Sequence, residues 1–204
     1  MTPAVIPRRD LLLLLAATAL AGCATRNTPP RRLYGLTGTP PLPGDARPGQ
    51  DDRAWVVSPQ LTLPELLDRS ELLVAEGEAG LRPWPEARWA EPLRDALPRV
   101  LADDLSRLRQ PYPVTLATPA NGDVQSLRLL VQVDEWLARP DGSGLTLRLR
   151  ARWHWASLKA PPGTALPPAG QADLSLACTA DADALAGAYR QSVLQLAARI
   201  VAGS

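Results

Sequence analysis

Histidine and cysteine are scarce in this chain of 204 residues: His154 is the only histidine, and Cys23 and Cys178 are the only cysteines. Structural zinc sites draw four ligands mainly from these two residue types, and a Ser-His-Asp arrangement needs a histidine beside its nucleophile. The chain also contains no glycine-rich phosphate-binding loop. We therefore expect no catalytic residue, no cofactor and no metal ligand, and we predict that the protein is not an enzyme.

An excess of charge of either sign is also missing. The chain has 22 basic and 21 acidic side chains, which gives a formal net charge of +1. Proteins that bind nucleic acid usually carry a basic excess or a basic patch, so this balance argues against a nucleic-acid partner. Phenylalanine is absent, and six tryptophans supply most of the aromatic bulk.

The N-terminus has the pattern of a secretion signal. A short basic stretch precedes the uncharged run Leu11–Ala21, which is too short to cross about 30 Å of hydrocarbon as a helix. The run ends in Leu20-Ala21-Gly22-Cys23, which matches the lipobox of bacterial lipoproteins. We therefore predict that residues 1–22 are a lipoprotein signal peptide and that Cys23 becomes the lipidated N-terminus.

The residues that follow suit a tether, because 23–32 are polar and contain proline. Ala24 is not the aspartate that retains enterobacterial lipoproteins in the inner membrane, so for a Gram-negative source we expect the periplasmic face of the outer membrane. Arg8-Arg9 resembles a twin-arginine export signal. A plain basic start in an arginine-rich chain explains the same residues, and both export routes stay open.

Acylation of Cys23 would leave Cys178 without a partner for an intrachain disulfide. Cys178 ends an alternating run, 172–178, and falls on its apolar face. We expect a buried thiol that acts as a small hydrophobic side chain.

Hydrophobic periodicity predicts strands and two helices after the tether. Strands with an apolar face that alternates at every second residue are typical of an antiparallel sheet with one buried side. The expected strands are 33–36, 55–57, 72–74, 114–116, 127–137, 145–155 and 171–178, of which the last three form a meander. The expected helices lie within 92–108 and near 181–202. This order predicts an α/β fold of the α+β sandwich type: a single domain, 33–204, in which two helices pack on one face of a mainly antiparallel sheet.

Details of the two helices follow from single residues. Pro98 either bends the first helix or marks its true start after a separate turn. The adjacent carboxylates of Asp103 and Asp104 are expected to face solvent. Asp181 and Asp183 suit the N-terminal end of the second helix, where Thr179 or Asp181 can cap it.

The sharpest polar cluster is a row on one face of the strand 145–155. Its members are Arg148, Arg150, Arg152 and His154. Such a row can contact lipid phosphates or an acidic partner. The alternative is a solvated face of the sheet without a binding role.

Two motifs in the middle of the chain carry a family resemblance. The segment 88–105 begins Arg-Trp-Ala-Glu-Pro-Leu, and 63–69 reads Leu-Pro-Glu-Leu-Leu-Asp-Arg. Together with the lipobox and a Tyr34-Gly35-Leu36 strand, they resemble the PqiC/YmbA family of lipoproteins, described as auxiliary components of ABC-type transport. Trp89, Glu91 and Pro92 match the family motif. Either the stability of the fold or contact with a partner explains why the motif has these residues.

The resemblance implies a binding and anchoring subunit of an intermembrane lipid transport system. The implied partner is an MCE-domain protein that spans the periplasm, and a homo-oligomeric ring is a further implication. The alternative function is a regulatory outer-membrane lipoprotein that binds and activates a cell-wall synthesis enzyme.

Overall fold

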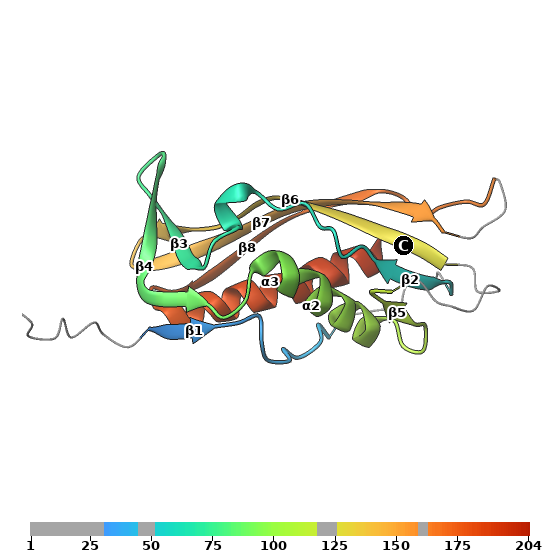
Figure 1. Cartoon of the computed structure of the whole chain (residues 1–204), viewed down its shortest axis with the longest axis horizontal. Helices are drawn as coiled ribbons and strands as arrows, with labels where there is room; N and C mark the ends of the chain where they lie inside the picture. Colours follow the sequence, from blue (N-terminus) through green and yellow to red (C-terminus); the bar gives the residue numbers. More distant parts are fainter. Residues whose placement is uncertain (1–30, 45–51, 118–125, 159–162) are drawn as a thin grey trace, which may run out of the picture. The chain divides into compact units, whose positions relative to one another are not determined.

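The computed structural model describes residues 31–44, 52–117, 126–158 and 163–204, which form one compact unit from Arg31 onward. Within these residues no helix is long and apolar enough to cross a membrane. Eight strands join into one mixed sheet, and two long helices lie against one side of it (Figure 1). The predicted α+β class, with two helices on one face, is therefore confirmed.

The centre of the sheet is a long hairpin. β6 (Ser126–Asp141) and β7 (Gly144–Ser157) pair antiparallel around a two-residue turn that starts at Gly142, whose φ of 60° lies in the region glycine tolerates best. β8 (Gly170–Thr179) pairs with the other side of β7. The predicted three-stranded meander is confirmed.

The other edge of β6 is shared by two shorter strands. β2 (Ala54–Val57) pairs in parallel with the beginning of β6, and β3 (Glu71–Glu76) pairs in parallel near its end, at Ala138. β5 (Val114–Thr115) extends the sheet beyond β2. β4 (Gly80–Trp89) pairs antiparallel with β3 and, in parallel, with β1 (Arg32–Tyr34).

β4 is not among the strands that the periodicity predicts. Pro83 and Pro85 interrupt its pattern, and its first seven residues are largely exposed, so the alternation of a half-buried strand is missing. A register shift opposite β3 falls between Pro83 and Arg88, and Glu86 within it has a φ of 58°. The strand exists because its backbone pairs with β3 and β1, which a one-dimensional pattern does not show.

The helices α2 (Leu93–Leu108) and α3 (Ala182–Ala202) match the two predicted helices. α2 is continuous, with Pro98 buried inside it, so neither a separate turn nor a later start is needed. α3 begins at the N-cap Asp181, whose carboxylate accepts a hydrogen bond from the backbone N–H of Ala184 at 2.8 Å. A hydrogen bond from the Thr179 hydroxyl, together with the one from Ala184, holds the pKa of Asp181 below its usual range.

One hydrophobic core lies between the helices and the sheet. The helix-facing residues of β7, from Leu145 to Trp155 at every second position, are all buried, as the alternation predicts. Tyr189 of α3 anchors the centre: its ring packs against those of Trp89 and Trp136 at centroid distances of 5.1 and 4.9 Å. Its hydroxyl donates to the backbone oxygen of Trp136, and burial raises the pKa of Tyr189.

A short helical segment covers the face of β3 that points away from the two long helices. The short 3-10 helix η1 (Glu65–Leu67) places Leu66 against Leu73, Ala75 and Leu137. β3 is consequently buried on both sides, which explains its continuous run of buried residues from Leu72 to Ala75.

Two glycines offer a matched test of this packing. A Cβ added at Gly170 would lie 2.3 Å from the ring of buried Trp153, whereas a Cβ at Gly187 on the surface of α3 would meet nothing within 4 Å. Gly170→Ala should therefore lower the free energy of unfolding by about 1–3 kcal/mol, and Gly187→Ala should raise it by about 0.5–1 kcal/mol. Urea denaturation of both variants checks this, and equal effects would contradict the packing described for β8.

Candidate functional site

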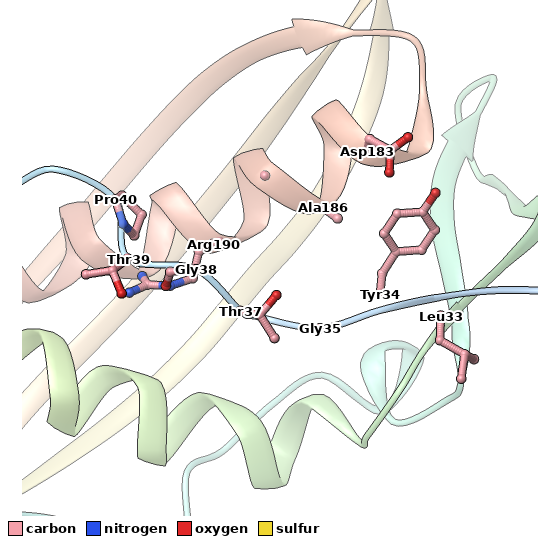
Figure 2. Close-up of a pocket in the computed structure, with 11 residues that line it drawn as sticks. Leu33, Tyr34, Gly35, Thr37, Gly38, Thr39, Pro40, Asp183, Ala186 and Arg190 are labelled. Atoms are coloured by element: carbon pink, nitrogen blue, oxygen red, sulfur yellow. The ribbon is translucent and has the colours of Figure 1, made fainter.

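The described part of the chain contains a groove where the N-terminal segment crosses α3. It has a volume of about 560 Å³ and is formed by residues 33–40 on one side and the first turns of α3 on the other (Figure 2). Tyr34 points toward the start of α3, where Asp183 lies, while Leu33 points away and is 68% exposed. On the side formed by α3, the groove is lined by Ala186 and Gly187. They leave space in the groove, because neither side chain extends beyond a methyl group.

The segment on the near side of the groove is held by backbone pairing. β1 pairs with the last residues of β4, in the register Tyr34 to Trp89. The N–H of Ala90 also donates to the carbonyl oxygen of Tyr34 at 2.7 Å. The central family motif therefore sits at the junction of β4, β1 and α2.

A buried ion pair lies behind the groove and joins the two helices. The Arg190 guanidinium of α3 donates to both carboxylate oxygens of Asp104 of α2, at 2.6 and 2.7 Å. Asp104 is 0% exposed and Arg190 is 6% exposed. Arg107 adds a third donor to the Asp104 carboxylate at 3.2 Å. A paired and hydrogen-bonded carboxylate is the arrangement that makes a buried charge tolerable.

The same arginines hold the N-terminal segment. Arg190 donates through Nε to the carbonyl oxygen of Gly38 at 3.1 Å, and Arg107 donates to the carbonyl oxygen of Pro40 at 2.8 Å. We call residues 37–40 the strap. Asp104 thus aligns two guanidinium groups whose remaining N–H groups bind the strap across both helices.

The expectation that Asp103 and Asp104 both face solvent is wrong for Asp104 and correct for Asp103, which is exposed. The sequence contains a signal for the burial of Asp104. Asp104 stands three residues after Leu101 and four before Leu108, so it continues the apolar stripe of the helix. Sequence reasoning also missed Arg190, which is next to Tyr189 on the buried side of α3.

The predicted arginine row lies where the alternation places it, exposed on the face of β7 opposite the helices. Each arginine is already paired with a carboxylate of a neighbouring strand. Arg148 makes two bonds to Asp173 of β8 at 2.6 and 3.0 Å, and Arg152 makes two to Asp134 of β6, both at 2.9 Å. These arginines hold the pKa values of Asp173 and Asp134 below their usual range.

Arg150 of the same row lies 2.9 Å from the carboxylate of Glu135, and His154 is exposed near the end of β7. A phosphate or an acidic partner would have to compete with these carboxylates for the arginines. The ion pairs agree with the alternative of a solvated face, and contact of this row with a partner or phosphate stays a prediction.

The two cysteines differ in what the structure describes. Cys178 lies on the helix-facing side of β8, half-buried against the core, and burial raises the pKa of its thiol. Cys23 lies outside the described residues. Within the described ranges, no group of three or more His, Cys, Asp or Glu side chains is placed to hold a metal ion.

The motif residues have distinct places in the fold. Trp89 is buried against Tyr189, Pro92 is the N-cap of α2, and Glu91 pairs with Arg99 at 2.6 Å on the surface. From the upstream motif, Leu67 enters the core and Asp68 pairs with Arg94 at 2.6 Å. Trp89 therefore packs against α3.

Comparison with known families decides the relationship. Residues 34–201 match the family described as ABC-type transport auxiliary lipoprotein component. The chain belongs to this family. The match covers all of the strands and helices described above except the first two residues of β1 and the last residue of α3, and it confirms the PqiC/YmbA resemblance.

Solved structures share the fold. Protein XCC0632 from Xanthomonas campestris is 16% identical with a TM-score of 0.64, over 83% of this chain and 92% of that one. A crystal structure of an uncharacterized protein is 18% identical with a TM-score of 0.56, over 85% of this chain and 98% of that one. A search of curated proteins gives no significant match.

The buried ion pair allows a direct test. Asp104→Asn removes the charge that balances Arg190 inside the protein, so the free energy of unfolding should fall by about 3–5 kcal/mol. Asp103→Asn, the exposed neighbour on the same helix turn, should leave it nearly unchanged. Chemical denaturation of the two variants measures the difference. Similar, small effects would mean that the Asp104–Arg190 pair does not hold the helices together.

Proposed function

We propose that this family member is attached by a lipid on Cys23 to the outer membrane and acts in the periplasm as a binding and anchoring subunit of an MCE-type lipid transport system. Residues 1–22 are its export signal, 23–32 its tether and 33–204 its binding domain. The observation that carries the proposal is the family match over residues 34–201 directly behind a lipobox.

The geometry of the strap supports an anchoring role. The tether would continue into β1 and the strap, where the chain is bound to β4 and to both helices rather than to one surface loop. A force on the N-terminus would therefore be transmitted to the helices through backbone hydrogen bonds and through Asp104 with its partners Arg190 and Arg107. Such a connection suits a domain that must hold a partner while it is itself held to a membrane.

The side of the sheet away from the helices supports a binding role. Over β6, β7 and β8 this face carries charged side chains in cross-strand pairs, and the strands beneath it are long. Binding sites built on strands are held more rigidly than sites on loops. In this proposal the face meets the MCE-domain protein, and the protein itself carries out no chemical step.

The lipid anchor has a built-in control, because the chain has a second cysteine. Cys23→Ser should abolish incorporation of radiolabelled fatty acid and move the protein from the membrane to the soluble periplasmic fraction. Cys178→Ser should change neither, since Cys178 lies within β8. Labelling and fractionation of both variants decide the point. A Cys23→Ser protein that is still labelled or still bound to membranes would refute the anchor.

The partner is tested by co-purification from detergent-solubilised envelopes. We expect an MCE-domain protein to co-purify with the wild type and to be reduced severalfold when Arg148, Arg150 and Arg152 are all changed to Gln. Arg99→Gln is the control, because Arg99 is similarly exposed and ion-paired but lies on α2. Recovery of cell-wall synthesis enzymes without any MCE-domain protein would overturn the proposal. Equal recovery from the triple variant would exclude the row as the docking surface.

A further inference from the structure

The N-terminal segment, residues 31–44, exposes a leucine near each of its ends. Leu33 is 68% exposed, the largest fraction among the exposed large hydrophobic side chains of the described residues, and Leu42 is 41% exposed. Of the exposed large hydrophobic side chains in the described ranges, none belongs to β6, β7 or β8. Exposed leucines are thus present on the N-terminal segment, whereas the sheet face with the arginine row has paired charges instead.

The N-terminal segment is held in place, so its leucines have fixed positions. β1, which contains Leu33, pairs with β4, and the strap that follows is bound by Arg190 and Arg107. Tyr34 points toward α3 and Leu33 points away from it (Figure 2). The strap lies on the helices, away from β6, β7 and β8 (Figure 1), and Leu42 comes two residues after it. The leucines are therefore exposed on the helix side of the domain.

The N-terminal segment is also positively charged. It contains two arginines, Arg31 and Arg32, and no acidic residue, and both arginines are exposed. The Arg32 guanidinium lies 3.5 Å from the Asp183 carboxylate, and the two side chains are 74% and 75% exposed. An ion pair of this kind is weak, so a phosphate can take the place of the carboxylate. By contrast, Arg148 and Arg152 of β7 each make two shorter hydrogen bonds to their carboxylates.

The backbone around Leu42 has few donors that need water. Leu42 stands between Pro41 and Pro43, and proline has no backbone N–H. A backbone donor that loses water without gaining a new partner costs free energy. The surroundings of Leu42 therefore favour contact with an apolar phase more than an ordinary exposed loop does.

The length of the preceding chain limits how far the N-terminal segment can lie from a lipid on Cys23. Arg31 stands eight positions after Cys23, and that length of fully extended chain spans at most roughly 28 Å. A lipid inserted in a bilayer would thus keep β1 close to the lipid headgroups. Contacts that are weak by themselves are then well populated, because the anchor supplies a high effective concentration of membrane surface.

We propose that the N-terminal segment rests on the phospholipid surface of the membrane that holds Cys23. Leu33 and Leu42 enter the boundary between headgroups and acyl chains, and Arg31 and Arg32 bind lipid phosphates. This contact is a second membrane signal beside the acyl chains, and it rests on the proposed lipid on Cys23. It also orients the domain: the helix side faces the membrane, and the arginine row of β7 faces away from it.

The test uses the mature lipoprotein, reconstituted into vesicles of phosphatidylethanolamine and phosphatidylglycerol that contain a spin-labelled phospholipid. In a Cys178→Ser background, a thiol-reactive NBD fluorophore is attached to Leu33→Cys or to Leu42→Cys. We expect a blue shift of the NBD emission and quenching by the spin label at both positions. His154→Cys, exposed on the face of β7 opposite the helices, is the control and should show neither effect.

The arginines are tested with the fluorophore at Leu33→Cys. Changing Arg31 and Arg32 together to Gln should lower the equilibrium constant for membrane contact, read from the quenched fraction, by about fivefold for each arginine, the factor expected for a basic residue near an anionic surface. The matched control changes Arg148 and Arg152 to Gln, and the quenched fraction should stay the same.

The outcomes separate the contact from the anchor, because flotation of the labelled protein with the vesicles reports the lipid on Cys23 independently. A protein that does not float lacks the anchor, and both the proposed function and the contact fail. A protein that floats without quenching at Leu33→Cys and Leu42→Cys, or with equal quenching at His154→Cys, overturns the contact alone. A photocross-linker on Leu33→Cys that captures a protein rather than phospholipid in cells also overturns it.

Discussion

The ion pair between Asp104 and Arg190 constrains most of what surrounds it. Two opposite charges removed from water stay favourable only while their geometry is kept, because separation would leave each without a partner in an apolar layer. α2, α3 and the strap are therefore held in one arrangement by a single carboxylate and the two guanidinium groups around it. Hydrophobic packing is non-directional, so these directed contacts add a specific alignment of the two helices.

This constraint lies where the N-terminal segment meets the two helices. The described chain begins at β1, which pairs with β4, and then runs across both helices as the strap before it continues to β2. The strap is thus bound to the helix layer. The opposite side of the domain is built differently, from long strands with paired charges over β6, β7 and β8. The helix layer lies between the strap and this part of the sheet (Figure 1).

Two strands at the border of the described sheet, β8 and the part of β4 that β1 does not cover, differ in how well their free edges are protected. β4 contains two prolines and a residue with a positive φ, Glu86. β8, by contrast, is regular, and Arg148 neutralises its one charged side chain. An exposed regular edge is a risk for any soluble protein.

Much of this fold follows from local chemistry. Strict alternation along 145–155 and 171–178, a turn glycine at Gly142 and the 3–4 spacing of leucines in 92–108 determined the meander, the hairpin and α2, because each pattern is set by the period of its own backbone. The lipobox and the family motifs likewise lie in contiguous residues. The arginine row was placed on its face of the sheet for the same reason.

Tertiary structure decided what depends on residues far apart in the chain. β4 forms because β3 and β1 supply its hydrogen bonds, despite two prolines in its own sequence. Asp104 is buried because Arg190, 86 positions later, brings the opposite charge. That β8 has an unpaired edge follows only from the strand order of the folded sheet. Sequence alone thus determined most of the helices and strands and their apolar faces. The pairing of the strands, the burial of charges and the free edges were decided only by the tertiary structure, because backbone and charged groups must find partners that are distant in the chain.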